Sequence, residues 1–540
     1  MDREINLDSI LALERQIEEQ RDEGHEKTII QLKRTRNSLL KISTLLPPEI
    51  LGSIFRWNVI PDGDFDGLPC GSYNFLLVCH HWFEVALRTP ELWSFWGNSP
   101  RDWEHRHARC RTAPLDLVLE TGTPWHEPSN QLLDALRDRA AQDTIRRIHL
   151  RSAQAGLLES VLPAIVTQGD GIRSNSVESF KVVNYGSFVD ISAFFSRYHL
   201  QKLRSLYLSG CRISSWGLLK SQTAALTTLT LTADNVSPVP TLPQLLSILS
   251  SSPLLQGFEF FHHRGSYIAG QDALTIHVQL RYLERLNLQA PFRLVFALLN
   301  RLELPDKMDT IILSLSECSS IDLSQTLGPY LGDRVRRRGR IPGGGIGLLA
   351  QQTQYDNSVF SLRVGDTRVG DDPTNVVWFV RISAGTSAKL EDEEAGRLFF
   401  DLIAHIIQWE QVTSLQTNLP ILRREECVEM RNLTHLHLVK VDPSTWFTEL
   451  VVRRPHASRE LLPGLDHIEI AEPTLRGGDW SPLTNFLSHR AAVGKRISSL
   501  RMTGHPHMDE EVVASMECVV DVFENFFFFL NLHYYPATAT

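Results

Sequence analysis

The chain has 540 residues, of which 42% are apolar and 22% charged, and its formal net charge at pH 7 is −9. This balance predicts a folded protein and argues against nucleic-acid binding as its main task, because phosphate neutralisation needs a basic surface. The seven cysteines are dispersed, which is typical of reduced thiols in the cytoplasm or nucleus and not of a disulfide framework. Neither an export signal nor a membrane-spanning stretch is evident, so we expect no membrane association.

Residues 1–42 form the first predicted unit. A helix is expected over 7–41, because this stretch contains no proline and a single glycine, Gly24. Its apolar residues make a broken stripe: Leu7, Ile10, Leu13, Ile17, Ile30, Leu32 and Leu39. Two interpretations stay open, a coiled coil that dimerises and an amphipathic helix that packs on its own protein. Gly24 and the polar gap from Glu18 to Lys27 interrupt the heptad pattern and favour the second.

Residues 43–96 are predicted to be a small all-α module. Pro47, Pro48 and Glu49 signal a helix start, because proline is tolerated in the first turn and an acid suits the positive end of the helix dipole. The apolar residues that follow give one wide helical face: Ile50, Leu51, Ile54, Phe55 and Val59. A turn-rich stretch, 61–72, comes next.

A second helix of this module is expected from about Tyr73 to Leu87. It is apolar nearly all round, so it needs packing partners on two faces. Pro90 ends this helix, and a short third element begins at Glu91.

The remainder, 97–540, repeats a pattern of apolar-x-x-apolar-x-apolar. The pattern occupies residues 145–150, 203–208, 226–231, 283–288, 433–438 and 465–470, with looser forms at 177–182 and 497–502. Each unit predicts a short strand after the x-x pair, followed by a helical return such as 242–249 or 292–299. Strands stacked in this way form an irregular leucine-rich-repeat solenoid. The Arg- and Gly-rich stretch at about 328–376 is predicted to be a flexible insertion.

Three segments of the module resemble the F-box family when taken in order. They are Leu46-Pro47-Pro48-Glu49-Ile50-Leu51-x-x-Ile54-Phe55, then Val78-Cys79-x-x-Trp82-x-x-Val85-Ala86, then Leu92-Trp93. The stretch from Trp103 to Leu119 and the helix before residue 43 are similar to those of fungal members with leucine-rich-like C-terminal domains. The sequence departs from the family at His80, where a basic residue is usual, and in the longer link 61–72.

The resemblance implies a substrate-recruiting adaptor of a cullin–RING (SCF-type) ubiquitin ligase, which is not itself an enzyme. Its F-box would bind a Skp-type adaptor, and its repeat domain would bind an unknown target protein. The implied adaptor-binding residues are Leu46, Pro47, Pro48, Ile50, Leu51, Ile54, Val78 and Trp82. The implied module core consists of Phe55, Cys79, Val85, Ala86, Leu92 and Trp93. The alternative is a repeat scaffold without a ligase, in which the F-box-like helices cap the solenoid.

Catalytic and metal chemistry have weak support in the sequence. Asp62, Asp64 and Asp66 match the first half of a calcium loop, but the required glutamate is replaced by Tyr73. The histidine groups lack partners at metal-ligand spacing, so we expect no metal, cofactor or catalytic residue. The predicted fold is therefore α/β, with an N-terminal helix and a small all-α F-box module followed by a leucine-rich-repeat solenoid of short parallel strands and helices.

Overall fold

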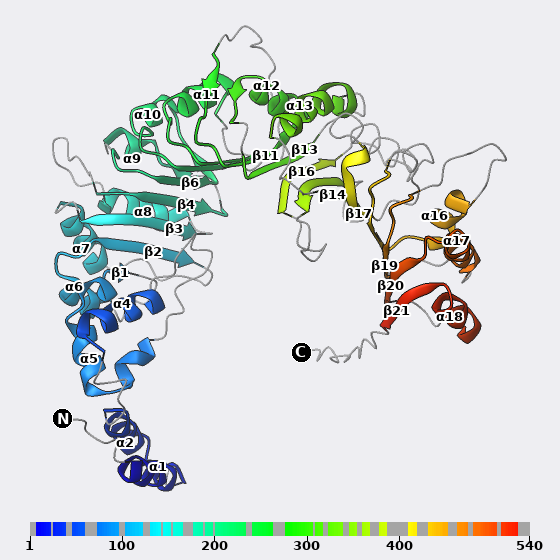
Figure 1. Cartoon of the computed structure of the whole chain (residues 1–540). Helices are drawn as coiled ribbons and strands as arrows, with labels where there is room; N and C mark the ends of the chain where they lie inside the picture. The colour runs from blue at the N-terminus through cyan, green and yellow to red at the C-terminus, as the bar shows by residue number, and fades with distance from the viewer. Residues whose placement is uncertain are drawn as a thin grey trace, which may run out of the picture. The chain divides into compact units, whose positions relative to one another are not determined.

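The computed structural model describes the following residues: 7–22, 25–38, 46–59, 73–96, 103–121, 130–141, 144–152, 155–165, 176–186, 189–197, 200–233, 240–262, 276–305, 308–316, 322–338, 345–353, 359–367, 377–385, 409–417, 430–451, 462–473, 479–504 and 509–526. The chain divides into two compact units, Met1–Leu255 (unit 1) and Gln256–Thr540 (unit 2). Figure 1 shows the elements of both. No helix in the described ranges is both long and apolar enough to cross a membrane.

Unit 1 begins with two helices, α1 (Leu7–Asp22) and α2 (Glu26–Ser38). They pack against each other, with Ile10 and Ile17 of α1 buried and an ion pair of 3.7 Å between Arg36 and Glu14. The sequence predicted one helix over 7–41. The structure instead has two helices, whose packing against each other buries Ile10 and Ile17 of the apolar stripe, while Ile30 stays 41% exposed.

The module that follows contains α4 (Pro48–Val59), the 3-10 turn η1 (Tyr73–Leu77), α5 (His80–Leu87) and the 3-10 turn η2 (Pro90–Trp93). The sequence predicted a single helix over 73–87. This prediction is wrong, because the stretch forms η1 and α5 as two separate elements. Cys79 has an extended backbone (φ −159°, ψ 171°) and precedes the first residue of α5, a conformation that no helix interior adopts.

The sheet of unit 1 contains strands that run parallel and pair in chain order. They are β1 (Phe95–Trp96), β2 (Leu115–Thr121), β3 (Ile145–Ser152), β4 (Ser179–Asn184), β6 (Ser205–Ser209) and β8 (Thr228–Ala233). The helices between them are α6 (Trp103–Cys110), α7 (Asn130–Ala141), α8 (Ala155–Ile165), α9 (Ser192–Arg197) and α10 (Gly217–Lys220), and α11 (Leu242–Ser250) follows β8. A short parallel pair, β5 (Val189–Asp190) and β7 (Cys211–Arg212), lies apart from this sheet.

The pairing register explains why the repeated pattern produces this sheet. Ile148, Phe180, Leu206 and Leu229 stand side by side on successive strands, and all four are buried. Alternate residues point the other way, where all of the neighbours of these four except Thr230 are only partly buried. One row of apolar side chains thus buries itself against the next row, which is how repeat arrays form a continuous core. The strand positions predicted from the pattern are confirmed in unit 1.

Unit 2 begins with β9 (Gly257–His262), β11 (Arg285–Pro291) and β13 (Thr310–Ser316), which run parallel. A second parallel series contains β17 (Val412–Thr417), β18 (His435–Val439), β19 (His467–Ala471), β20 (Ile497–Thr503) and β21 (Val520–Phe526). The short strands β10 (Val278–Gln279) and β12 (Leu302–Glu303) form a separate pair. The remaining elements are α12 (Phe292–Leu299), η3 (Asp322–Leu327), α13 (Gly328–Arg338), η4 (Trp409–Gln411), α16 (Pro443–Val451), α17 (Ser481–Ala492) and α18 (Glu510–Glu517).

The stretch expected to be a flexible insertion, 328–376, contains α13 and the strands β14 (Gly345–Thr353) and β15 (Val359–Thr367). These strands pair antiparallel with each other, and β15 pairs antiparallel with β16 (Val377–Gly385). The chain order is interrupted here, because β13 pairs with β16 and β14 pairs with β17. The molecule is therefore a mixed α/β protein with extensive parallel strand pairing, consistent with the repeat solenoid that the sequence predicts.

Candidate functional site

Helix α4 has one buried face and one exposed apolar face. It begins at Pro48, whose missing N–H costs nothing in a first turn, and the Pro47 carbonyl accepts hydrogen bonds from the backbone N–H groups of Ile50 and Leu51, each at 3.0 Å. Leu51 and Phe55 are spaced i, i+4 and are both 0% exposed. These two residues anchor the helix to the module.

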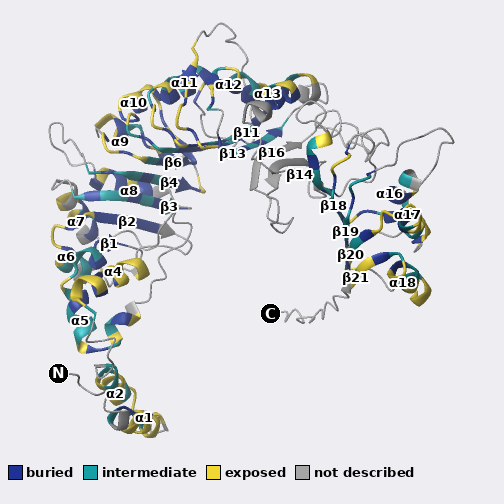
Figure 2. Cartoon of the chain, viewed as in Figure 1, coloured by how far each residue is buried: buried dark blue, intermediate teal, exposed yellow. Residues whose placement is uncertain are grey.

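A second side of α4, about 100° round the helix from the first, carries Ile50, Ile54 and Trp57, which are 49%, 41% and 74% exposed. They are spaced i, i+4, i+7, so they lie one above another along the helix. Pro47, just before the helix, is also exposed. We call these four residues the apolar face of α4. Figure 2 shows exposed residues along this helix in the N-terminal part of unit 1.

The core beneath α4 is well packed. The Phe55 ring stacks on Phe75 with centroids 4.5 Å apart, and its centroid lies 5.2 Å from that of Trp82. Gly52 allows Thr89 to lie close to the backbone of α4, because a Cβ at position 52 would stand 3.2 Å from the Thr89 hydroxyl oxygen. The Trp93 indole N–H donates to the Ala86 carbonyl at 2.9 Å. The α4 helix is therefore held in a defined orientation.

The residues that the resemblance implied for adaptor binding are divided between these two sides. Pro47, Pro48, Ile50 and Ile54 are exposed, and Leu46, Val78 and Trp82 are half-buried. Leu51 is fully buried, so it belongs to the module core and has no surface to offer a partner. The physical reason is the helical period, which turns adjacent residues such as Ile50 and Leu51 about 100° apart.

The residues implied for the module core, Phe55, Cys79, Val85, Ala86, Leu92 and Trp93, all lie buried. The sequence prediction did not include Trp57, whose side chain is 74% exposed. Its signal was present, because Trp57 continues the spacing of Ile50 and Ile54 by one more turn. The link 60–72, with its three aspartates, lies outside the described residues.

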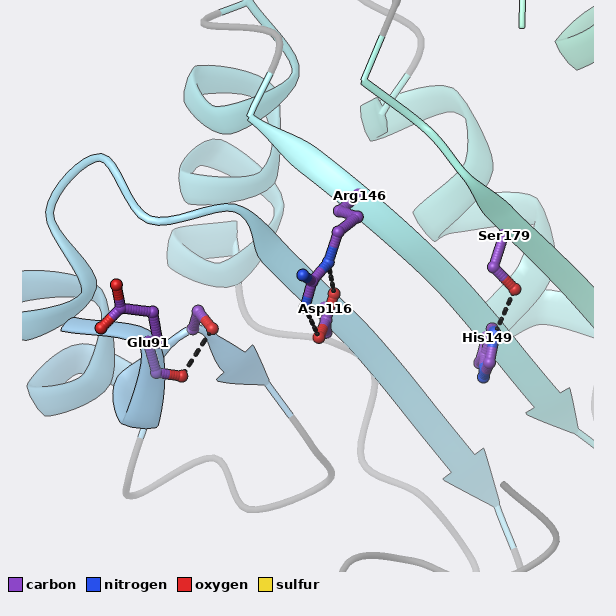
Figure 3. A network of polar contacts seen from close by, with 6 residues as sticks. Glu91, Asp116, Arg146, His149 and Ser179 are labelled. Carbon is purple, nitrogen blue, oxygen red and sulfur yellow. Dashed lines mark hydrogen bonds and ion pairs between the residues drawn. The ribbon is translucent and has the colours of Figure 1, made fainter. Parts of the chain in front are cut away.

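A chain of polar contacts joins the module to the repeat sheet (Figure 3). The Ser94 hydroxyl donates to the Glu91 carbonyl at 2.8 Å, and the Asp116 backbone N–H donates to the Ser94 carbonyl at 2.9 Å. The buried Asp116 carboxylate accepts two hydrogen bonds from Arg146, at 3.0 and 2.6 Å. Hydrogen bonding to Asp116 raises the pKa of the Arg146 guanidinium. The module is thus continuous with strands β1, β2 and β3.

Metal chemistry has no support in the described part of the chain. Within those ranges, no group of three or more His, Cys, Asp or Glu side chains is arranged to hold a metal ion. The Cys211 thiol is buried, which raises its pKa to about 12, so it is not poised as a nucleophile.

Comparison with known proteins adds little to this description. No family model matches the sequence, and no curated protein matches it. The crystal structure of the TLR13–ssRNA13 complex is similar over 79% of this chain, with 12% sequence identity and a TM-score of 0.25. The similarity covers 64% of that chain. The fold assignment rests on the strand pairing described above.

Proposed function

We propose that the chain is a substrate-recruiting adaptor of a cullin–RING (SCF-type) ubiquitin ligase. In this proposal the module of residues 46–96 binds a Skp-type adaptor, and the repeat domain binds a target protein. The observation that carries the proposal is the apolar face of α4. A helix fixed by a packed core and still exposing Ile50, Ile54 and Trp57 is suited to docking in the groove of another protein.

The energetics agree with such a contact. Complete burial of an Ile side chain contributes about 1.5–3 kcal/mol, and about half of each Ile remains to be covered. With Trp57 included, covering this face would contribute roughly 3–5 kcal/mol. Exposed tryptophans are frequent energetic centres of interfaces. Val78 and Trp82, which the resemblance also implies for adaptor binding, are half-buried.

A second candidate function is supported by a different observation. Strand β1 pairs with β2, and Phe95 and Trp96 are buried, so the end of the module also covers the first strand of the repeat sheet. This is what a terminal cap does for a solenoid. In that case the chain would be a repeat scaffold for protein–protein interaction, without a ligase.

The adaptor proposal is tested by binding of the full chain to a purified Skp-type adaptor. The variant Ile50→Asp/Ile54→Asp places two charges on the apolar face of α4. We expect it to weaken binding at least about a hundredfold, because the carboxylates would have to be buried against apolar groups. Val493→Asp, at a position 51% exposed in unit 2, is the matched control and should bind as the wild type does.

Far-UV circular dichroism and thermal unfolding should show that the double variant still folds cooperatively, since Ile50 and Ile54 are 49% and 41% exposed and lie outside the fully buried core of the module. The adaptor proposal fails if the wild-type chain does not bind, or if the double variant binds equally well. The capping function is tested by starting the chain at residue 97, which removes the whole module with α4, α5, η2 and β1. Loss of cooperative unfolding of unit 1 would then favour the cap.

A further inference from the structure

The helix pair α1–α2 is joined to the module by a side-chain hydrogen bond at the end of α2. The Asn37 Nδ2 group donates to the Val78 backbone carbonyl at 2.8 Å, across 41 positions of the chain. Helix α2 lies against α5 in this region (Figure 1). The helix pair therefore reaches the module at a residue that the resemblance implies for adaptor binding.

The Val78 carbonyl can accept this bond because the helix is broken next to it. In a continuous helix, the carbonyl would accept the backbone N–H four residues further on. Here Cys79 has an extended backbone, and the first bond of α5 joins the Phe83 N–H to the Cys79 carbonyl at 3.1 Å. A backbone carbonyl that loses its helical partner needs another donor, and the Asn37 amide supplies it.

The Asn37 amide is held in its orientation by Arg36. The Arg36 Nε and Nη2 groups both donate to Asn37 Oδ1, at 3.1 and 2.9 Å. The oxygen of the amide is therefore on the Arg36 side, which leaves the Nδ2 group for Val78. Arg36 Nη1 also lies 3.7 Å from Glu14 Oε1, so both helices of the pair contribute to the contact.

The hydrogen bond acts on the backbone of a residue that has surface left to offer. The direction of the Val78 carbonyl is set by the ψ angle of Val78, at the point where the chain leaves η1. Fixing this carbonyl fixes the peptide unit, and with it the direction in which the half-buried Val78 side chain points. The Asn37 amide therefore controls a residue of the module from a separate helix.

We propose that Asn37 is a positioning residue of the adaptor-binding site, which holds Val78 in the orientation that the Skp-type adaptor contacts. This inference rests on the proposed function, because it concerns the same partner. The physical effect is preorganisation. Without the hydrogen bond the carbonyl samples other orientations, and the apparent dissociation constant rises by the inverse of the fraction that stays competent to bind.

The test measures binding of the full chain to a purified Skp-type adaptor by calorimetry. Asn37→Asp keeps the size of the side chain and an oxygen for Arg36, but it replaces the donor toward Val78 by a carboxylate oxygen. We expect the dissociation constant to rise about fivefold, which is the usual effect of one hydrogen bond. Asn300→Asp makes the same charge change at an exposed position after α12 and is the matched control. Wild-type affinity of Asn37→Asp overturns the proposal.

A double-mutant cycle with Val78→Ala separates positioning from a general loss of stability. Val78→Ala removes the side chain that the hydrogen bond orients. In this background Asn37→Asp should therefore weaken binding by less than about twofold. Fully additive effects would show that Asn37 acts on binding by another route, and they would overturn the proposal.

Hydrogen exchange shows whether the variants stay folded and whether the break is loosened. Exchange over 115–121 should match the wild type, whereas exchange over 73–87 should be faster in Asn37→Asp, because the break loses a hydrogen bond. Unchanged exchange over 73–87 contradicts the holding role of the amide. If Asn37→Asp does not fold, Arg36→Met decides. It releases the amide without adding a carboxylate and should raise the dissociation constant roughly twofold, so wild-type affinity of this variant overturns the proposal.

Two outcomes separate this inference from the proposed function. If the wild type binds, Ile50→Asp/Ile54→Asp does not and Asn37→Asp binds as the wild type does, only the role of Asn37 is removed. If the wild type does not bind, the proposed function is removed, and the adaptor-binding role of Asn37 falls with it.

Discussion

Replacement of Arg146 by methionine tests the ion pair that joins β2 to β3. The Asp116 side chain is 1% exposed and that of Arg146 is 26% exposed, and the two form hydrogen bonds of 3.0 and 2.6 Å. Methionine keeps most of the side-chain volume but removes every N–H donor, so the carboxylate would stay buried without its cation. Breaking a buried pair from one side costs about 3–5 kcal/mol. Because water can reach Arg146, we expect the lower end of this range.

The assay is hydrogen exchange of the full chain, followed by mass spectrometry on peptides that cover 115–121 and 145–152. A loss of about 3 kcal/mol corresponds to roughly hundredfold faster exchange through opening of these strands. Arg137→Met is the control, because the Arg137–Asp134 pair of α7 is mostly exposed and surface pairs contribute less than ~1 kcal/mol. The reasoning is refuted if Arg146→Met exchanges like the control. It is also refuted if Asp116→Leu/Arg146→Met, which removes the orphaned charge, recovers none of the protection.

The other predictions concern packing, backbone and pH. Leu51→Ala should lower the free energy of unfolding of unit 1 by about 2–5 kcal/mol. Ile54→Ala, at a half-exposed position, should change it by less than ~1 kcal/mol. Equal losses of the two variants in urea unfolding would contradict the assignment of a buried and an exposed face to α4. Gly210→Ala should lower the melting temperature, because Gly210 has φ +64° and a Cβ would stand 2.1 Å from the Asn184 carbonyl oxygen; an unchanged melting temperature would exclude that conformation. The pKa of His149 is lowered to about 4 from 6.5, so the unfolded chain takes up the proton first as pH falls. The stability of unit 1 should therefore drop by about 2 kcal/mol from pH 7 to pH 5, and His149→Gln should remove this drop. An NMR titration midpoint near 6.5 for this imidazole would contradict the prediction.

Several parts of the fold followed from local sequence patterns. The apolar-x-x-apolar-x-apolar units predicted strands at the positions of β3, β6, β8 and β11, because alternation with a period of two residues is a property of the strand itself. The helical returns over 242–249 and 292–299 correspond to α11 and α12. The start of α4 at Pro48 was equally local, since it depends on proline at the first helical position.

Other features depend on contacts between residues far apart in the chain. The break at Cys79 accompanies the packing of Phe75 and Trp82 around Phe55, which no local pattern of 73–87 reveals. Strand β13 pairs with β16, and β14 pairs with β17. In both pairs the partner residues are more than 60 positions apart in the chain.

The sequence by itself determined where the strands with the repeated pattern form, where α4 begins and which residues are apolar enough to be buried. The tertiary structure alone decided which of those residues stay covered. Ile50 and Leu51 are chemically equivalent neighbours, yet one is 49% exposed and the other 0%, because only the packing of α4 on α5 and η2 defines its inner side. The same holds across the sheet, since His149 and Lys181 come together only through the register of β3 and β4. A periodic pattern gives every helix or strand its faces, but the partner that covers a face is chosen by non-local packing.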